Sequence, residues 1–365
     1  MLPGCLAVRR LCAGGLRRSA ARCFGASSLP VVDIEPFLAG GSLADRQHSA
    51  QKLDWACRQR GFFYLEGHGV AEGEVQGLHR LAKDFFALPS AAKESIALSP
   101  HRNFARGYQK LGMNVTQSKK DWHEAIDFYA EIDPCTVNFE TLAGIQGPHL
   151  RRAHEFVKGR NRWPSQPGDF RGALETYFSQ MNKVGNALME AMALAFGLPE
   201  NYFDPVMKDS FWGARVIGYP SLPDDAPGLS CGEHTDYGCW VILAQDQTEG
   251  ALEVKTPEGR WVPASPQPGR LVVNLGDMLS VWTRGRWMAT EHRVRHTSAN
   301  LRTSVVYFHE PNFDAVIHPL DQDATEVTRC PPPSSAALAG GLAGGPVSYG
   351  EHLYARVSQN FDFSA

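Results

Sequence analysis

The chain has 365 residues, 43% of them hydrophobic, and a formal net charge of -3 at pH 7. This length fits one large catalytic domain with helical additions, and the small net charge excludes the basic field of a nucleic-acid-binding protein. No apolar run approaches the roughly 20 residues of a membrane span, and the cysteines include no C-x-x-C pair, so we expect no membrane partner and reduced thiols.

Residues 1–28 have the composition of a targeting segment. They contain arginines, serines and alanines but no Asp or Glu, which is typical of an organellar transit peptide. The stretch "RCFGASS" resembles a mitochondrial processing site, with cleavage after Phe24. We therefore expect a disordered transit peptide and a mitochondrial protein, with a plastid or cytoplasmic location as the alternatives.

Residues 29–145 form an amino-terminal region with mixed helical and extended patterns. We expect a short strand at 30–37 and, in "ADRQHSAQKLDWACRQRG", an amphipathic helix that ends at its glycine. "FFYLEGHGV" is typical of a strand and turn, and "EGEVQGLHRLAKDFFAL" of a second helix that the following Pro89 stops. The region is therefore predicted to be α+β.

Residues 146–168 are predicted to be an irregular linker, because Gly-Pro, Trp-Pro and Pro-Gly dipeptides interrupt them. A long helix is expected within 169–203, where apolar residues recur every three or four positions from Phe170 to Met192. That spacing indicates a scaffold helix with one buried stripe.

From Phe211 onward the apolar pattern alternates with a period of two, which is typical of strands. Several short strands between Gly, Pro and Asp turns predict a double-stranded β-helix, or jelly roll, over 204–330. Within "RLVVNLGDMLSVWT" we expect two strands joined by a turn at Gly276-Asp277.

The end of the chain is predicted to add two further segments. Residues 331–346 have the composition of a disordered low-complexity insertion. Residues 347–365 are expected to form a carboxy-terminal helix near the barrel. The fold class is thus mainly β with flanking helices, with a jelly-roll core and an α+β amino-terminal region.

One pattern in the strand-rich region has the composition of a metal site. Side chains two residues apart in an extended segment point the same way, so His234 and Asp236 present an imidazole and a carboxylate to one side. His292 offers a second imidazole from a distant segment. Two His and one carboxylate on one face of a metal leave the opposite positions open, as non-haem Fe(II) oxygenases require. These three residues are therefore our candidate metal ligands.

A second pattern lies ten residues after His292. Alternation places Arg302 and Ser304 on one face of a strand. A guanidinium fork with a neighbouring hydroxyl suits a carboxylate that is held bidentately. We therefore expect a carboxylate-binding clamp beside the metal site.

Together, the His-x-Asp pair, the distal His in "EHRVRH" and the Arg-x-Ser in "RTS" resemble the Fe(II)/2-oxoglutarate-dependent dioxygenases of the isopenicillin N synthase-like superfamily. The resemblance covers nearly everything after the leader, including "LPVVDIEPFL", "CRQRGFFYLEGHGV", "KKDWHEAIDF" and "VSYGEHLYARV". It implies Fe(II) on the three candidate ligands, 2-oxoglutarate with its far carboxylate at Arg302 and Ser304, dioxygen as co-substrate, and ascorbate as a possible reductant. The implied reaction hydroxylates or desaturates a small molecule and releases succinate and carbon dioxide.

The resemblance also extends to residues around the expected cofactors. Tyr219 matches a family position that contacts 2-oxoglutarate, although Ile217 stands where plant members typically have Asn. Phe308 and Glu310 match positions that face substrate in flavonoid-oxidising relatives. Their alternatives are a barrel-core Phe and a strand-end surface acid. No catalytic side chain beyond the metal site is implied.

Arg215 is a further candidate for substrate binding. If Tyr219 points into the barrel, alternation along "RVIGY" turns Arg215 inward as well. A cation in a mostly apolar barrel needs a neutralising partner, which is either a protein acid such as Glu310 or an anionic substrate group. The second alternative predicts a substrate that bears a carboxylate or an acidic phenol.

Two other functions share parts of this pattern. An oxidase of the same fold, like isopenicillin N synthase, carries Arg-x-Ser but uses no 2-oxoglutarate, and succinate production separates it from an oxygenase. A non-catalytic metal-binding module is disfavoured by the intact ligand set. The sequence indicates a small-molecule substrate without identifying it, and it carries no signal for an oligomeric state.

Overall fold

The computed structural model describes residues 29–99, 105–142, 144–145, 148–226, 228–320 and 346–360. The predicted leader and all but the last residue of the predicted low-complexity insertion lie outside these ranges. Among the helices described, none is both long and apolar enough to cross a bilayer.

Two antiparallel-rich sheets face each other and form the jelly roll. The main sheet has the order β1 (Val31–Asp33), β2 (Phe62–Glu66), β12 (Leu271–Leu275), β9 (Trp240–Gln245), β14 (Arg302–His309), β7 (Gly213–Tyr219), β6 (Glu124–Tyr129) and β3 (Gly107–Gln109). The smaller sheet has the order β11 (Trp261–Pro263), β10 (Leu252–Lys255), β13 (His292–Val294) and β8 (Cys231–His234). Two short ribbons complete the strands: β4 (Val115–Thr116) with β5 (Lys119–Lys120), and β15 (Val316–Ile317) with β16 (Val347–Ser348).

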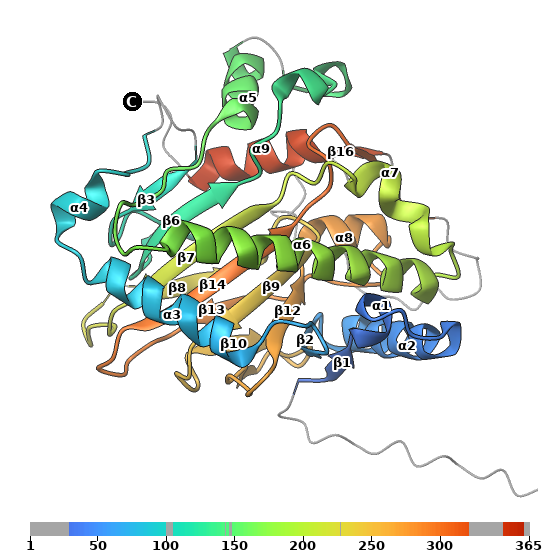
Figure 1. Ribbon diagram of the computed structural model, residues 1–365, viewed down its shortest axis with the longest axis horizontal. Helices are drawn as coiled ribbons and strands as arrows, with labels where there is room; N and C mark the ends of the chain where they lie inside the picture. Colours follow the sequence, from blue (N-terminus) through green and yellow to red (C-terminus); the bar gives the residue numbers. More distant parts are fainter. Residues whose placement is uncertain are drawn as a thin grey trace, which may run out of the picture.

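The helices cover the outer face of the main sheet and its edges. They are α1 (Glu35–Leu38), α2 (Leu43–Gln59), α3 (Glu72–Phe86), α4 (Ser90–Glu94), α5 (Pro148–Lys158), α6 (Phe170–Ala195), α7 (Asp204–Met207), α8 (Asp277–Trp282) and α9 (Tyr349–Asn360), with 3-10 turns at Pro134–Thr136, Phe139–Thr141 and Glu200–Phe203. Figure 1 shows α6 crossing the strands of the main sheet, with α3 next to it.

Helix α6 confirms the predicted scaffold helix. The stripe from Phe170 to Met192 is buried against the main sheet. The approach is closest at Gly185, where a Cβ atom would lie 2.3 Å from the His309 ring of β14. Only glycine allows this contact, so α6 rests directly on the strand that also carries Arg302 on its other face.

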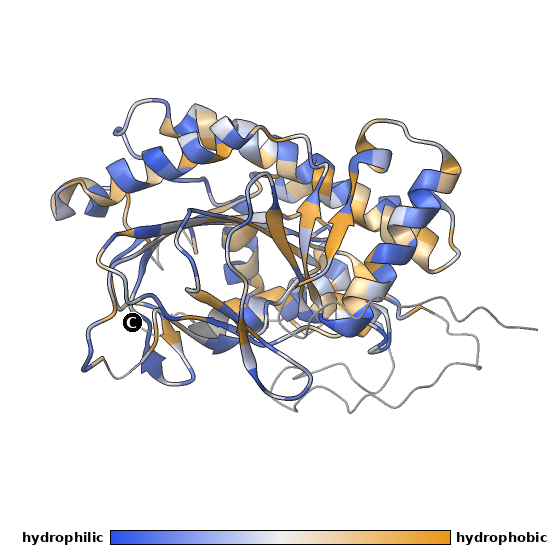
Figure 2. Cartoon of the chain, turned by 90° about the horizontal axis from the view of Figure 1, so that it is seen from below, coloured by the Kyte–Doolittle hydropathy of each residue, from blue (hydrophilic) through white to orange (hydrophobic). Residues whose placement is uncertain are grey.

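The structure has two hydrophobic cores. One fills the space between the main sheet and the helices, and the other lies between the two sheets. The inner core is built by alternate residues of both sheets, as period-two patterning requires; examples are Phe62, Ile217, Val241, Leu252 and Val306. Figure 2 shows hydrophobic residues gathered in the central strands, whereas the helices carry both hydrophobic and hydrophilic residues. Residues that face the inner core can thus also line a site between the two sheets.

The predicted strand at 30–37 is wrong in its second half. Strand β1 stops at Asp33, and α1 starts at Glu35 with Pro36 in its first turn. Asp33 Oδ1 accepts a hydrogen bond from the Glu35 backbone N–H at 2.9 Å, which turns the chain. Proline is well suited to a first helical turn, because its missing N–H would have no partner there.

The predicted irregular linker at 146–168 contains a helix, α5. Ala153, Phe156 and Val157 form its buried face, and the Phe156 ring packs 5.1 Å from that of Tyr129. Spacings of three and four residues are helical. The stripe was overlooked because prolines flank it closely, although Pro148 only opens the helix.

The predicted turn between two strands at Gly276-Asp277 is also wrong. Gly276 is the N-cap of α8, so "DMLSVW" is helical rather than extended. All six residues of α8 are buried, and a segment without an exposed face has no periodicity that separates helix from strand. Close packing explains why residue 276 is a glycine, since a Cβ there would lie 2.2 Å from the Gly238 carbonyl oxygen.

The helix predicted at 347–365 is found as α9 over Tyr349–Asn360, whereas Val347–Ser348 form β16 and 361–365 lie outside the described residues. Its packing near the barrel is confirmed. Leu353, Tyr354 and Val357 are buried. The Arg356 guanidinium donates to Asp277 of α8 at 2.9 Å, and His352 Nε2 lies 3.0 Å from the Tyr237 carbonyl oxygen. These contacts place α9 over the segment that follows the His-x-Asp pair.

Candidate functional site

A cavity of about 830 Å³ lies between the two sheets. Its wall takes residues from both sheets, from the segment before β6 and from α9. All nine residues singled out from the sequence line it: His234, Asp236, His292, Arg302, Ser304, Tyr219, Arg215, Phe308 and Glu310. One cavity therefore holds both predicted ligand sites and the candidate substrate residues.

The three candidate metal ligands converge on one point. His234 ends β8, His292 begins β13, and the two are paired in register. His234 Nε2 lies 3.8 Å from Asp236 Oδ1, and His292 Nε2 lies 3.5 Å from Asp236 Oδ2. All three donor atoms lie within 4.8 Å of one another. Such a set of two imidazoles and one carboxylate fits a metal that keeps open positions.

Hydrogen bonds hold each of these side chains in a ligating orientation. His234 Nδ1 lies 2.7 Å from the Gly232 carbonyl oxygen, and His292 Nδ1 lies 3.2 Å from that of Thr290. In each ring, Nδ1–H donates outward, so Nε2 keeps its lone pair toward the centre. Asn274 donates to Asp236 Oδ2 at 2.7 Å. Burial, together with His234, lowers the pKa of His292 to about 4. Burial also acts to lower the pKa of His234, but Cys231 and Asp236 outweigh it and raise that pKa to about 10, so metal binding at His234 would displace a proton.

At another part of the cavity, Arg302 supplies a buried guanidinium. Its side chain donates from Nη2 to Gln245 Oε1 at 3.2 Å, whereas Nε and Nη1 have no partner among the described residues. The guanidinium lies 4.7 Å from the centre of the Tyr219 ring. A buried cation with free N–H groups is costly unless an anion meets it. The residues therefore fit a carboxylate such as the far end of 2-oxoglutarate.

Tyr219 and Ser304 complete this end of the cavity. Tyr219 is the register partner of Arg302, and Ser304 follows on the same face of β14. Burial raises the pKa of Tyr219 to about 12, so its phenol stays protonated and able to donate. Ile217 and Arg215 also line the cavity, which confirms the predicted alternation along β7.

Arg215 is neutralised by Asp127 of the adjacent strand β6, not by Glu310. Arg215 Nη1 lies 3.4 Å from Asp127 Oδ2, and Nη2 donates to Asn114 Oδ1 at 2.8 Å. The pair still lines the cavity, so both groups remain within reach of a ligand. Sequence reasoning missed this partner because β6 and β7 are paired only in the folded protein.

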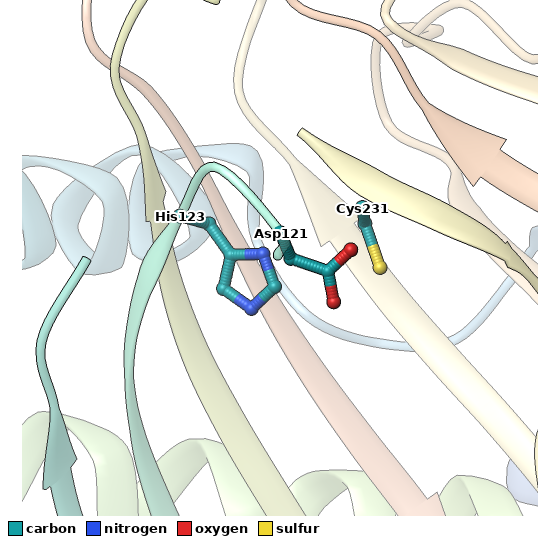
Figure 3. Close-up of side chains that lie close together, drawn as sticks. All are labelled: Asp121, His123 and Cys231. Atoms are coloured by element: carbon teal, nitrogen blue, oxygen red, sulfur yellow. The ribbon is translucent and has the colours of Figure 1, made fainter. Parts of the chain in front are cut away.

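Sequence reasoning also missed the cluster of Asp121, His123 and Cys231. Figure 3 shows the first two from the segment before β6 and the third from β8. Their possible ligand atoms lie within 4.8 Å of one another. The D-x-H spacing in "KKDWHEAIDF" is the signal that could have found it, because it places both side chains on one face.

The cluster is a hydrogen-bonded wall rather than a second metal centre. Asp121 accepts from Thr116 Oγ1 at 2.7 Å and from the Gly232 backbone N–H at 2.8 Å. His123 Nδ1 lies 2.7 Å from the Ser230 carbonyl oxygen, and its Nε2 lies 3.3 Å from Arg215 Nη2. The remaining imidazole lone pair therefore faces a guanidinium, which opposes binding of a cation.

Phe308 and Glu310 lie at the end of β14 and face the cavity. Glu310 is 5% exposed, so the alternative of a surface acid is wrong. Its Oε2 accepts from the Cys239 backbone N–H at 3.0 Å. Burial, followed by the charge of Asp236, raises the pKa of Glu310 to about 8.

Two family models match the chain. Residues 29–166 match the amino-terminal region described as that of a non-haem dioxygenase in morphine synthesis. Residues 201–311 match the 2OG-Fe(II) oxygenase superfamily. The second match contains the His-x-Asp pair, His292 and the predicted carboxylate clamp at Arg302 and Ser304.

Several curated relatives extend over almost the whole chain. A homoarginine-6-hydroxylase from Oryza sativa subsp. japonica is 37% identical over 348 residues, which cover 92% of this chain and 98% of the relative. One from Glycine max is 36% identical over 351 residues, with the same coverage. Another, from Arabidopsis thaliana, is 35% identical and covers 92% of this chain and 98% of the relative.

Solved structures show the same fold. A Neurospora crassa protein in complex with alpha-ketoglutarate and 5-formyluracil has a TM-score of 0.71 at 23% identity, and the match covers 91% of this chain and 96% of that one. A dioxygenase for auxin oxidation in rice has a TM-score of 0.64 at 23% identity, with the same coverage of both chains.

Proposed function

The chain belongs to the 2OG-Fe(II) oxygenase superfamily, and from that premise we propose how its residues divide the reaction and which substrate they take. The protein is an Fe(II)- and 2-oxoglutarate-dependent oxygenase that acts on a small molecule with dioxygen. When bound, iron with 2-oxoglutarate and dioxygen supplies the oxidising chemistry that hydroxylates a C–H bond or desaturates a C–C bond and releases succinate and carbon dioxide.

In this proposal His234, Asp236 and His292 hold the iron. The observation that carries the assignment is the convergence of their donor atoms within 4.8 Å in the wall of the cavity. Hydrogen bonds from the two Nδ1–H groups and from Asn274 fix the ligand orientations.

Arg302, Tyr219 and Ser304 hold the far carboxylate of 2-oxoglutarate. Two unpartnered nitrogens of the buried guanidinium, Nε and Nη1, support this role, because each leaves a donor open to a carboxylate oxygen. The phenol of Tyr219 and the hydroxyl of Ser304 are neutral donors on the same side of the cavity. Their part is to bind and orient the co-substrate, while the apolar inner core keeps water away from it.

The substrate that this cavity fits best is a free amino acid with a guanidino side chain, such as L-homoarginine. Relatives from rice, soybean and Arabidopsis that match 92% of the chain are homoarginine-6-hydroxylases. The cavity supports the same class, since its wall carries groups of both charges. An amino acid also contains the carboxylate that Arg215 was expected to recognise.

The amino-acid head group is assigned to the Arg215–Asp127 pair. Arg215 is suited to the α-carboxylate and Asp127 to the α-ammonium, because both side chains line the cavity next to each other. The α-carboxylate would take over part of the role of Asp127 at Arg215, and the α-ammonium part of the role of Arg215 at Asp127. The net buried charge would then remain zero. This keeps the cost of desolvation low.

A substrate panel tests the proposal. The enzyme, reconstituted with Fe(II), is supplied with 2-oxoglutarate and with L-homoarginine, L-arginine, L-lysine or a neutral amino acid. Succinate and the oxidised amino acid are then measured by mass spectrometry. We expect turnover with L-homoarginine above that with the neutral amino acid, and equal turnover with both would contradict the substrate class.

For residues 1–28 we keep the proposal of a mitochondrial transit peptide, which their Arg-rich, acid-free composition supports. A full-length fluorescent fusion is expected in mitochondria, and a fusion that starts at Gly25 is expected to lose this location. Cytosolic fluorescence from the full-length fusion would contradict the proposal.

A further inference from the structure

We propose that Glu310 binds the terminal cation of the substrate and thereby selects a guanidinium over a neutral group of the same shape. The inference rests on the proposed substrate class and assigns a specificity-determining residue within it.

Most acids in the cavity wall already have a partner. Asp277 pairs with Arg356 at 2.9 Å, Glu233 with Arg293 at 3.0 Å, and Glu291 with Lys255 at 2.5 Å. Asp127 pairs with Arg215, Asp121 accepts hydrogen bonds on both oxygens, and Asp236 belongs to the metal triad. These acids need no cation from a ligand.

Glu310 differs from all of them. Within the part of the chain that the structure describes, it forms no ion pair, although it is 5% exposed and lines the cavity. Its Oε2 accepts from the Cys239 backbone N–H at 3.0 Å, and the Tyr349 hydroxyl lies near the carboxyl group. Burial, followed by the charge of Asp236, raises the pKa of Glu310 to about 8, which reflects the cost of ionising a buried acid without a cation. A ligand cation would remove that cost.

The carboxylate is held firmly in place. A Cβ atom on Gly238 would lie 1.6 Å from Glu310 Oε2, so the carboxylate fits into the space that this glycine leaves open. Ser210 Oγ donates to the Glu310 carbonyl oxygen at 2.5 Å and fixes the backbone. A side chain positioned in this way can meet a planar guanidinium without first losing much conformational entropy.

The position also matches the length of the substrate. Arg215 is paired in register with Val306, four residues before Glu310 on the same chain segment. At about 3.3 Å per residue, the two levels are roughly 13 Å apart. From bond lengths of about 1.5 Å, extended L-homoarginine measures about 10 Å between its two charged ends. The difference of about 3 Å is smaller than the length of either side chain.

Both ends of this arrangement lie near a metal ligand. The charge of Asp236 acts on Glu310, and Cys231, which acts on Arg215, has its Sγ 3.9 Å from His234 Nδ1. A guanidinium on Glu310 would hold the carbon next to it on the Asp236 side of the cavity. The head group remains at the Arg215–Asp127 pair.

Binding measurements under anaerobic conditions test the proposal. The Fe(II)- and 2-oxoglutarate-loaded protein is titrated calorimetrically with L-homoarginine and with L-homocitrulline, its neutral ureido isostere. We expect the wild-type protein to bind L-homoarginine about 10- to 100-fold more tightly than L-homocitrulline, as a charge-assisted hydrogen-bonded pair gives. In Glu310→Gln this preference should fall to about unity. Glu249→Gln, which removes an exposed glutamate outside the cavity, should leave it unchanged.

The outcomes distinguish a failure of the proposed substrate class from a failure of the role of Glu310. Wild-type protein that binds neither amino acid would overturn the substrate class and this inference with it. Wild-type protein that prefers L-homoarginine, together with Glu310→Gln that keeps the preference, would overturn the role of Glu310 alone. If Glu310→Gln fails to fold, as its melting curve shows, Glu310→Asp replaces it. The shorter carboxylate should lose most of the preference, and an undiminished preference would count against the proposal.

Discussion

At the Arg302 end of the cavity, a buried guanidinium keeps Nε and Nη1 without partners in the described chain. At the Glu310 end, a buried carboxyl group accepts from the Cys239 backbone N–H and forms no ion pair with a described residue. Between them, Arg215 is paired with Asp127, and the Asp277–Arg356 pair joins α8 to α9. Arg302 and Glu310 therefore remain open to a ligand of opposite charge, whereas the two ion pairs stabilise the cavity wall. An isolated buried charge destabilises the protein unless something of opposite sign binds it.

The largest expected effect comes from removing a metal ligand. Asp236→Ala should abolish iron binding and turnover, because two imidazoles alone do not complete the ligand set. The fold should survive, since two hydrophobic cores support it independently of the site. Bound iron, succinate release and the melting temperature measure these effects. Full activity in both Asp236→Ala and His292→Ala would show that the triad is misassigned.

A smaller effect is expected at the Arg302 end. Arg302→Lys keeps the charge but loses the fork that spans two carboxylate oxygens. We expect the KM for 2-oxoglutarate to rise about 10- to 100-fold, with a smaller change in kcat. Arg295→Lys is the matched control, because Arg295 is exposed and outside the cavity. An unchanged KM in Arg302→Lys would place the co-substrate carboxylate elsewhere.

Substitutions in the Arg215–Asp127 pair should affect stability as well as substrate binding, unlike those at Arg302. Arg215→Met leaves Asp127 buried without its cation and should lower the free energy of unfolding by about 3 kcal/mol. Adding Asp127→Asn should restore most of that stability. The KM for the amino acid should remain about 10-fold raised in both variants. If the double variant recovers both stability and KM, the pair is structural only and does not bind the head group.

The smallest effect concerns acid stability on the helix side of the main sheet. Burial lowers the pKa of His309 to about 3 and that of His79 to about 4, from about 6.5 in the unfolded chain. The unfolded state therefore binds more protons, so both contributions are complete above pH 6.5 and decrease as the pH falls toward 4. These two groups together should lower the free energy of unfolding by about 2 kcal/mol between pH 7 and pH 5.5. His123 and His352, whose pKa values burial lowers to about 3 and about 4, add to this loss.

Denaturant titrations of His309→Leu test this dependence. Removing the His309 imidazole should reduce the pH-dependent loss by about 1 kcal/mol. His309 has no hydrogen-bond partner on either ring nitrogen in the described chain, so the variant loses no such bond. An identical loss in the variant and the wild-type protein would show that other groups control acid unfolding.

The same contrast explains what could be predicted from the sequence. His234, Asp236, Arg302 and Ser304 form local patterns, and period-two alternation is enough to place each pair on one face. Both ends of β14 face the cavity for this reason. The alternation along β7 likewise predicted that Arg215 points inward.

What the sequence could not give were contacts between distant segments. Asp127 neutralises Arg215 only because β6 pairs with β7. Glu310 lacks a cationic partner in the described chain because Cys239, Tyr349 and Gly238, which lie next to its carboxyl group, bring no cation. Helix α8 was predicted to be extended because burial on all sides removes its periodicity. Helix α5 was overlooked because its stripe is short and bordered by prolines.

The central claim is that one cavity couples the Arg302-bound co-substrate to a guanidino amino acid held between Arg215 and Glu310. It is tested most directly by the ratio of oxidised L-homoarginine to succinate in a single reaction with limiting 2-oxoglutarate. We predict that L-homoarginine accelerates succinate release and that the two products form in nearly equal amounts. Succinate release that does not respond to L-homoarginine, or that rises without any oxidised amino acid, would contradict the account.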